Sequence, residues 1–399
     1  ACDSAEWNGV WYYNDTIVTD TGFVTTNSFG GATATSSGKE GNIWYFGQYA
    51  GLDFNSGIPV SLADGQLYTN EGCASIADNN GDLLFYTDGM IVYNKNHLIM
   101  QNGTGLLGNN SSTQSGIIVK APGSSTIYYV FTVDGMSGNS GGLNFSEVDM
   151  TLDGGLGAVT INKNMPVFPN ACEKITLVLH PNDTDFWIVS RLVNSNIYHS
   201  YLLTSLGLNF TPVVTNLGPV YNQDLGYLKA SPDGTKIAAA NYISNSFDLF
   251  DFNKNTGVLS NALTHSINSP YGLEFSPNSN ILYVGEYYGP NIMQYNLLAG
   301  SSTAIISSEI SIAVTGASIG ALQLAPDGTI CICQVGSVYL DVIQNPDIVG
   351  LGCNFITNAI FLSSGSNLNG LPTFFSSIFN SPPAGCDSVA TAIIDIKNS

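Results

Sequence analysis

The segment Gly370-Leu-Pro-Thr-Phe-Phe-Ser-Ser377, close to the C-terminus, decides how the fold is interpreted. It has the pattern of the first strand of a repeating β unit, but the strands that should come after it do not follow. Strands of that kind occur instead near the other end of the chain, at Asn42-Ile-Trp-Tyr-Phe-Gly47. These two incomplete pieces predict a ring that is closed by its own two ends.

Three well-preserved copies of the unit lie in the second half of the chain. Each is a short alternating strand that runs into a Pro-Asp-Gly or Pro-Asn-Ser turn, in which Pro presets φ and the next residues accept turn conformations. The copies are Tyr227-Leu-Lys-Ala-Ser-Pro-Asp-Gly234, Gly272-Leu-Glu-Phe-Ser-Pro-Asn-Ser279 and Ala321-Leu-Gln-Leu-Ala-Pro-Asp-Gly328. Fainter copies extend the series backwards, so that first strands begin near residues 75, 118, 177, 228, 273 and 322. Adding the last spacing of 49 residues reaches Leu371.

A seven-bladed β-propeller explains the incomplete pieces, because its last blade takes strands from both ends of the ring. In this arrangement Leu371, Phe374 and Phe375 pair with the strand that holds Trp44 and Phe46. A pair of β-sandwiches or an open solenoid would also contain repeated strands. Neither alternative accounts for a lone first strand at the end.

The composition agrees with a fold of short strands and turns. Charged residues make up only 10% of the 399 residues, with 43 Gly, 20 Tyr and 19 Phe, whereas helical proteins favour Ala, Glu, Lys and Leu. The formal charge is −20 and Arg191 is the only arginine. Binding to nucleic acid or to an anionic membrane is therefore disfavoured, because both need clustered positive charge.

The sequence also indicates a compartment. No apolar run reaches the roughly 18 residues of a membrane-spanning helix, and the start at Ala1-Cys-Asp-Ser4 lacks the pattern of a signal peptide. We therefore expect a mature product or a segment of something longer. Seven cysteines in a Ser/Thr-rich, Lys-poor chain favour an oxidising exterior over the cytosol.

Several short motifs are distributed along the central region. They are Trp44-Tyr-Phe-Gly47, Gly51-Leu-Asp-Phe-Asn55, Glu71-Gly-Cys-Ala-Ser-Ile76, Leu84-Phe-Tyr-Thr-Asp-Gly89, Glu173-Lys174, Gly320-Ala-Leu-Gln-Leu-Ala-Pro-Asp-Gly328 and Gly370-Leu-Pro-Thr-Phe-Phe375. With these motifs, residues from about 42 to 380 resemble the N-terminal propeller region of large Bacteroidota surface proteins. Those are the gliding-motility-associated proteins exported by the type IX secretion system.

The flanks carry a different pattern. Cys2-Asp-Ser4 and Trp7-Asn-Gly9 lie in residues 1–37, and Gly385-Cys-Asp-Ser-Val-Ala-Thr391 lies in residues 384–399. Together they resemble the Ig-like repeats of the same adhesins. The resemblance implies an all-β chain in which a seven-bladed propeller, residues 38–383, is inserted into one small Ig-like β-sandwich repeat of a stalk. Alternatively, the flanks are halves of two neighbouring repeats.

The resemblance also suggests covalent features of the flanks. Cys2 and Cys386 lie in equivalent Cys-Asp-Ser contexts, so a disulfide between them is a candidate, with two separate thiols as the alternative. The triplets around Ser4, Thr16 and Ser388 look like the O-glycosylation motif of Bacteroidota exported proteins.

The other cysteines give no metal-site pattern. Cys331 and Cys333 share one face of a predicted strand. Two thiols alone make a poor metal site, so buried structural cysteines are favoured. Cys73, Cys172 and Cys353 cannot be paired from the sequence.

No motif identifies catalytic or metal-binding residues. The four histidines belong to no Gly-x-Ser-x-Gly or His-Glu-x-x-His motif. Asp78-Asn-Asn-Gly-Asp82 lacks the distal Glu of a calcium loop and occupies a turn position, although adventitious calcium binding stays an alternative. Several acids could line the central channel, but no spacing singles out an acid/base pair: Glu147, Glu173, Asp224, Glu274 and Glu286.

These observations lead to a functional prediction. We expect a non-enzymatic, cofactor-free segment of a cell-surface adhesin, exported through type IX secretion, that binds extracellular glycans or proteins in the context of gliding motility. Its partners would include the secretion machinery and neighbouring repeats of the same chain. One alternative is an extracellular glycan- or lactone-processing propeller enzyme, with paired carboxylates and a metal at the channel mouth. Another is a passive spacer or a component of the secretion machinery.

Overall fold

The computed structural model describes residues 4–7, 10–13, 38–135, 141–222, 225–314 and 318–379. The chain divides into two compact units, Lys39–Asn380 and a smaller one made of Ala1–Gly38 and Ser381–Ser399. In the smaller unit, the described residues form an antiparallel hairpin of β1 (Ser4–Trp7) and β2 (Val10–Tyr13). The predicted pairing of this region with the C-terminal flank lies outside the described residues.

Sheets dominate the larger unit, and within the described residues there are six of them. Three sheets have four antiparallel strands each: β20 (Leu228–Ala230), β21 (Lys236–Asn241), β22 (Ser246–Asn253) and β23 (Val258–Ser266); β24 (Pro270–Phe275), β25 (Ile281–Glu286), β26 (Asn291–Asn296) and β27 (Ile310–Val314); β28 (Ile319–Leu324), β29 (Ile330–Gln334), β30 (Tyr339–Ile343) and β31 (Phe355–Phe361). A fourth sheet has five strands: β15 (Ala171–Leu179), β16 (Phe186–Leu192), β17 (Ile197–Thr204), β18 (Gly207–Leu208) and β19 (Val213–Asn216).

The other two sheets come from the first part of the unit. One has three strands, β3 (Ile43–Phe46), β4 (Ala50–Asp53) and β5 (Val60–Leu62). The other has nine: β6 (Ala74–Ala77), β7 (Leu83–Thr87), β8 (Ile91–Asn94), β9 (Ile99–Thr104), β10 (Gly116–Lys120), β11 (Ile127–Val133), β12 (Leu143–Asp149), β13 (Ala158–Val159) and β14 (Met165–Phe168).

Helices are scarce in the described part of the chain. The α-helix is α1 (Ser302–Ser307), in which the Ser301 Oγ accepts a hydrogen bond from the Ala304 N–H. The 3-10 turns are η1 (Asp153–Gly155), η2 (Leu297–Ala299), η3 (Gly350–Cys353) and η4 (Ser376–Phe379). Among the described residues, none of these helices has the length and apolar character to cross a membrane. The all-β class predicted from the sequence is therefore confirmed.

The repeated turns form as their sequences predict. In each turn the fourth residue adopts a positive φ: Gly234 (72°), Ser279 (63°) and Gly328 (81°). The N–H of Gly234 donates to the Ser231 carbonyl at 2.8 Å, and the other two turns close in the same way. Glycine adopts positive φ without a steric penalty, which explains why two of the three turns end in it.

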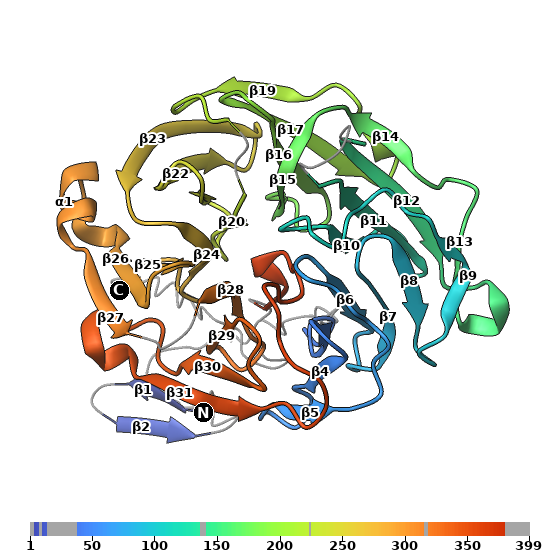
Figure 1. Cartoon of the computed structure of the whole chain (residues 1–399), viewed down its shortest axis with the longest axis horizontal. Helices are drawn as coiled ribbons and strands as arrows, with labels where there is room; N and C mark the ends of the chain where they lie inside the picture. The colour runs from blue at the N-terminus through green and yellow to red at the C-terminus, as the bar shows by residue number, and fades with distance from the viewer. Residues whose placement is uncertain are drawn as a thin grey trace, which may run out of the picture. The chain divides into compact units, whose positions relative to one another are not determined.

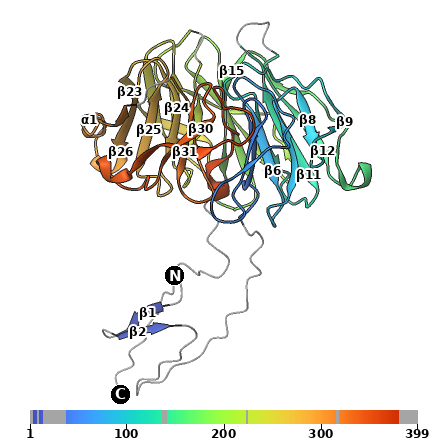
Figure 2. The same ribbon diagram turned by 60° about the horizontal axis from the view of Figure 1, so that its bottom comes forward.

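The sheets are arranged like the blades of a propeller, with strand β6, β10, β15, β20, β24 or β28 of each meander nearest the centre (Figure 1). These are the first six strands that the repeat predicted. Viewed from the side, the strands run between two rims of loops (Figure 2). The number of blades depends on how the nine-stranded sheet is divided. Its two meanders meet through one parallel pair, Ala158 with Gln101.

The ring closes differently from the prediction. Residues 371–375 do not form a strand beside β3 within the described residues. Instead Pro372 makes a parallel bridge to Cys73, and the Thr373 N–H donates to the Cys73 carbonyl at 2.8 Å. Proline has no N–H to donate, so this segment cannot build a continuous ladder. Phe374 nevertheless packs on Trp44, with ring centroids 5.8 Å apart.

The other ring-closure residues lie in the same buried region. Leu371, Trp44 and Phe46 belong to the main hydrophobic core, while Phe375 is half-buried against Phe186. The described cysteines form no disulfide and are all buried: Cys73, Cys172, Cys331, Cys333 and Cys353. The expectation of buried cysteines at positions 331 and 333 is therefore confirmed.

Candidate active site

Side chains from several sheets converge where the innermost strands begin. Glu71 comes shortly before β6, Thr113 before β10 and Tyr227 before β20, while Glu173 and Tyr271 lie near the starts of β15 and β24. Because these strands occupy equivalent places around the ring, their starts lie together at one end of its centre. We call this end the channel mouth. This mouth is the candidate active site.

Glu71 is half-buried at the channel mouth. Its Oε2 accepts a hydrogen bond from the Tyr271 hydroxyl at 3.0 Å, and its Oε1 accepts one from the exposed Ser111 hydroxyl at 3.4 Å. Burial, and then the negative charge of Glu173, raise the pKa of Glu71 to about 7, which the hydroxyl hydrogen bonds oppose. Near neutral pH this carboxyl can therefore both accept and release a proton.

Glu173 is the second carboxylate of the site, and only 3% of its surface is exposed. Its Oε2 accepts hydrogen bonds from the Thr113 N–H at 2.9 Å and from the Thr113 hydroxyl at 3.2 Å. The same hydroxyl oxygen accepts from the Gly226 N–H at 3.2 Å. These contacts stabilise a charged Glu173, whose field acts on Glu71.

The side chain of Gln114 holds the neighbouring inner strands together. Its Nε2 donates to the carbonyls of Ile175 (2.9 Å) and Leu228 (3.1 Å). Its Oε1 accepts from the N–H groups of the same two residues, at 3.3 and 2.8 Å. A buried side-chain amide thus takes the place of main-chain pairing between β15 and β20. It holds the backbone of these two strands in position close to Glu173.

Four tyrosines extend from Glu71 to the solvent, and we call them the tyrosine wall: Tyr242, Tyr271, Tyr287 and Tyr288. The ring of Tyr271 lies 5.3 Å from that of Tyr287, which lies 5.1 Å from that of Tyr288. Tyr271 is buried and Tyr288 is 74% exposed. The Tyr287 hydroxyl donates to Asn369 Oδ1 at 3.2 Å. This bond anchors the middle of the wall to residues 369–375, which we call the closing segment.

A second polar group lies along the inner strands, on the side toward the Pro-Asp-Gly turns. Lys229 Nζ is 2.9 Å from Glu274 Oε2, and it also donates to Gln323 Oε1. The side chains of Lys229 and Glu274 are 1% and 0% exposed. This enclosed ion pair links β20, β24 and β28, and we assign it a structural role.

The other predicted channel acids do not belong to the site. Glu147 lies on β12, where its carboxylate accepts from the Thr160 hydroxyl at 2.8 Å. Glu286 accepts from the Asn291 amide at 2.6 Å. Asp224 lies outside the described residues. Among the described residues, no group of three or more His, Cys, Asp or Glu side chains is arranged to hold a metal ion.

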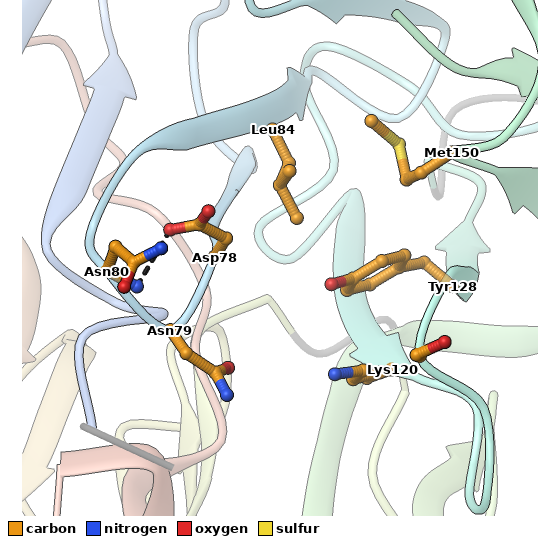
Figure 3. A pocket seen from close by; sticks show the side chains of 8 residues that line it. Asp78, Asn79, Asn80, Leu84, Lys120, Tyr128 and Met150 are labelled. Atoms are coloured by element: carbon orange, nitrogen blue, oxygen red, sulfur yellow. Dashed lines mark hydrogen bonds between the residues drawn. The ribbon is translucent and has the colours of Figure 1, made fainter. Parts of the chain in front are cut away.

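A pocket of about 270 Å³ lies at the other end of β6 from Glu71 (Figure 3). Its lining consists of Asp78, Asn79, Asn80, Leu84, Lys120, Ser125, Tyr128 and Met150. Asp78 Oδ1 accepts from the N–H groups of Asn80 (2.8 Å) and Asp82 (3.0 Å), so residues 78–82 form the predicted turn. The pocket is separate from the channel mouth.

The sequence-based candidates in the flanks remain predictions. Cys2, Cys386, Thr16 and Ser388 lie outside the described residues, and Ser4 begins β1. Their disulfide and glycosylation are therefore untested.

Comparison with known proteins supports the fold. No protein-family model matches the sequence, and no curated protein does. A proposed 6-phosphogluconolactonase from Bacteroides fragilis is 11% identical, with a TM-score of 0.51 over 84% of this chain and 98% of that one. A second, from Bacteroides uniformis, is 12% identical, with a TM-score of 0.49 over 78% of this chain and 94% of that one. A luciferin-regenerating enzyme is 11% identical, with a TM-score of 0.41 over 76% of this chain and 96% of that one.

These findings correct the prediction of a non-enzymatic adhesin. The similar structure with a TM-score of 0.51 is named as a proposed lactonase. The prediction rested on the resemblance to surface adhesins and on the lack of any acid/base spacing in the sequence. Glu71 and Glu173 lie about a hundred residues apart in the sequence, and the arrangement of successive blades brings them together. Glu173 was a predicted channel acid, whereas Glu71 was missed.

Proposed function

We propose that this protein hydrolyses a lactone at the channel mouth, with Glu71 as the general base. The observation that carries the proposal is the position of Glu71, half-buried beside Glu173 and hydrogen-bonded to Tyr271. Lactonase activity, named for the Bacteroides fragilis protein of similar fold, is compatible with this site. A single carboxylate base is sufficient for ester-type hydrolysis, because water is the nucleophile.

The proposed reaction has two steps. The Glu71 carboxylate accepts a proton from water, whose oxygen attacks the lactone carbonyl to form a tetrahedral oxyanion. The intermediate then collapses: the bond from the carbonyl carbon to the ring oxygen breaks, and protonated Glu71 returns its proton to that oxygen. The product is an open hydroxy acid. The exposed Ser111 hydroxyl donates its one proton to Glu71 Oε1 at 3.4 Å, and it can turn to donate to the oxyanion once Glu71 is protonated.

The Tyr271 hydroxyl would orient the base. It donates to Glu71 Oε2, which leaves Oε1 to face the water on the side of Ser111. Glu173 would keep the pKa of Glu71 near neutrality through its negative charge. No step requires a metal ion.

Substitution of Glu71 tests the proposal. Glu71→Gln should lower kcat for lactone hydrolysis about 100-fold or more, because the amide cannot accept the proton. Wild-type kcat should rise with pH through about 7 as Glu71 loses its proton. Glu147→Gln, a carboxylate on β12 outside the site, is the matched control. Equal rates for Glu71→Gln and wild type, after subtraction of spontaneous hydrolysis, would rule out Glu71 as the base.

We also propose that the ring has seven blades, with the nine-stranded sheet counted as two. The single pair between β13 and β9 supports this division, because separate blades of a propeller are not expected to share a long ladder. An experimental structure with β9 and β13 paired along their lengths would contradict it.

Finally, we retain the proposals that the larger unit is inserted into an Ig-like repeat and that the chain is exported. Support for insertion comes from the two ends of the larger unit: a Cβ placed at Gly41 would lie 2.4 Å from the Phe379 ring, so these ends are adjacent. Peptide mapping under non-reducing conditions should link Cys2 to Cys386, and cell fractionation should find the protein outside the cytoplasm. Two free thiols at these positions would contradict the predicted disulfide.

A further inference from the structure

The tyrosine wall provides a surface beside the proposed catalytic base. The Tyr271 hydroxyl donates to Glu71, and the Tyr271 ring lies 6.3 Å from that of Tyr242. Tyr242 in turn lies 5.8 Å from the exposed ring of Tyr288. The two rings are tilted by 49° to each other, so a ligand ring that stacks on Tyr288 would meet Tyr242 at an angle. Through Tyr242 and Tyr271 this surface is continuous with Glu71.

The charges near this surface are unsuitable for an anionic ligand. Glu71, Glu173 and the buried Glu286 are all acidic, and the chain carries a formal charge of −20. A ligand with a phosphate group would be repelled unless a cation faced it.

The cations close to the channel are already engaged. Three backbone carbonyls, of Leu225, Gly226 and Ala240, accept hydrogen bonds from Lys174 Nζ at 2.6–2.8 Å. Lys229 is buried in its ion pair with Glu274. Both lysines lie on inner strands, and their ammonium groups are used in contacts within the protein.

Other cations lie at the far end of the strands or away from the channel. Lys120 ends β10 and lines the separate pocket, and Lys236 begins β21, where it pairs with Asp251 at 2.8 Å. Arg191 is 1% exposed, lies over the ring of Tyr221 and donates to Asn241 Oδ1 at 3.3 Å, so it is buried and engaged. Lys163 and Lys254 are also engaged elsewhere, with the carbonyls of Asn102 and Asp233. Among the hydrogen bonds, ion pairs and cation–ring contacts of the described residues, none joins a cation to a tyrosine of the wall.

From this arrangement we infer that the substrate is an uncharged sugar-derived lactone, and that its ring stacks on the exposed Tyr288, with Tyr242 beside it on the side of Tyr271 and Glu71. Tyrosine offers a large, rigid surface for the C–H face of a sugar, and its hydroxyl can bond the hydroxyls at the edge. The inference rests on the proposed lactone hydrolysis. It differs in substrate from the phosphorylated lactone named for the structural neighbours, which this acidic mouth would repel.

The test compares two probes, D-glucono-1,5-lactone and its 6-phosphate, using the full chain and subtracting spontaneous hydrolysis. Wild type should show at least about tenfold higher kcat/KM for the neutral lactone. Tyr288→Ala should raise KM for it at least about fivefold with little change in kcat, because this ring is exposed and contacts no reacting atom. Tyr288→Phe should keep the wild-type KM if stacking is the main contribution. Tyr49→Ala, an exposed tyrosine that contacts Tyr68, is the matched control.

The outcomes separate this inference from the proposed function. If Glu71→Gln is inactive but the phosphorylated lactone is preferred, or if Tyr288→Ala leaves KM unchanged, the substrate inference is wrong and the proposed base stands. If wild type hydrolyses neither lactone, or Glu71→Gln retains full activity, the proposed function is wrong and the inference falls with it. Unchanged thermal unfolding of Tyr288→Ala would confirm that the variant is folded.

Discussion

Glu71 combines features that are usually found apart: it reaches the solvent, yet its proton is held more tightly than that of an ordinary carboxyl. Burial and the charge of Glu173 raise its pKa from 4.5 to about 7. A carboxyl whose pKa is higher in the folded chain binds more protons when folded than when unfolded. This residue therefore stabilises the fold in acid and less so at neutral pH.

The stability of the fold should reveal this residue directly. Between pH 4.5 and about 7, the contribution of Glu71 to the free energy of unfolding should fall as the pH rises. Over this range, wild type should lose up to about 3 kcal/mol relative to Glu71→Gln, which has no proton to release. Urea unfolding of both proteins at pH 4.5, 6 and 7.5 measures the difference. Other buried acids, such as Asp88 and Asp248, are present in both proteins and cancel. Parallel pH curves would contradict the raised pKa.

At this scale the sequence predicted some residues and missed others. Glu173 was a predicted channel acid because it lies near the start of an inner strand. Glu71 appeared only within a motif, since its role depends on Tyr271, 200 residues away. No local spacing could indicate that contact. The tyrosine wall was missed for the same reason, because its members come from the loop after β21 and from the loop after β25 as well as from β24.

At the scale of the elements, the closing segment (residues 369–375) joins two neighbouring parts of the ring through a small number of hydrogen bonds. It lies between two inner strands: the Asn369 N–H donates to the Asn70 carbonyl, and the Asn369 carbonyl accepts from the Ala321 N–H, both at 2.8 Å. A Cβ at Gly370 would lie 1.8 Å from the Glu71 carbonyl oxygen. Glycine is therefore required here because another backbone approaches closely.

Gly370→Ala should consequently affect both stability and the site. Overpacking against the Glu71 backbone should lower the free energy of unfolding by about 1–3 kcal/mol, and the displaced Glu71 should lose activity. Gly116→Ala is a suitable control, because its Cβ would meet no atom closer than 3.6 Å and its φ is not positive. Thermal unfolding and lactone hydrolysis of both variants give the comparison. A Gly370→Ala protein as stable and active as the control would contradict this packing.

Elements with a strong local signal were predictable from the sequence. The first strands of six repeats were located because each ends in a recognisable turn, such as the one closed by Gly234. The seventh could be located near Leu371, but its pairing could not, because Pro372 removes a donor and one bridge to Cys73 replaces the ladder. Helix α1 was not predicted, since six residues carry little periodicity.

At the scale of the whole molecule, the Lys229–Glu274 pair connects three sheets that follow one another along the chain. Lys229 comes from β20, Glu274 from β24 and Gln323 from β28. Removing one partner of a buried ion pair leaves the other charge without compensation, which is more damaging than removing both.

Lys229→Met should therefore lower the free energy of unfolding by about 3–5 kcal/mol. The double variant Lys229→Met/Glu274→Leu should be more stable than the single one. Lys236→Met is the matched control: its pair with Asp251 is 28% and 43% exposed, and its loss should cost about 1 kcal/mol or less. Chemical denaturation at neutral pH provides the values. If the single variant were at least as stable as the double variant, the unpaired Glu274 charge would not be the cause of the lost stability.

The propeller-like arrangement was predictable because the strand-and-turn unit repeats along the sequence. The blade count was not, because β13 and β9 connect two meanders that the repeat treats as separate. The function was mispredicted for a related reason. The adhesin prediction came from motifs in the central region and in the flanks, whereas the contact between Glu71 and Tyr271 depends on the three-dimensional arrangement of the blades.

The contacts of Asn369 and Gly370 beside Asn70 and Glu71 also set the order in which the molecule acquires its properties. The ribosome makes Glu71 and Glu173 long before it makes the segment packed against them, 369 − 71 = 298 residues later. Contacts over such separations form late in folding. The surroundings of Glu71 are therefore incomplete until nearly the whole chain has been synthesised, and the proposed activity should appear only then.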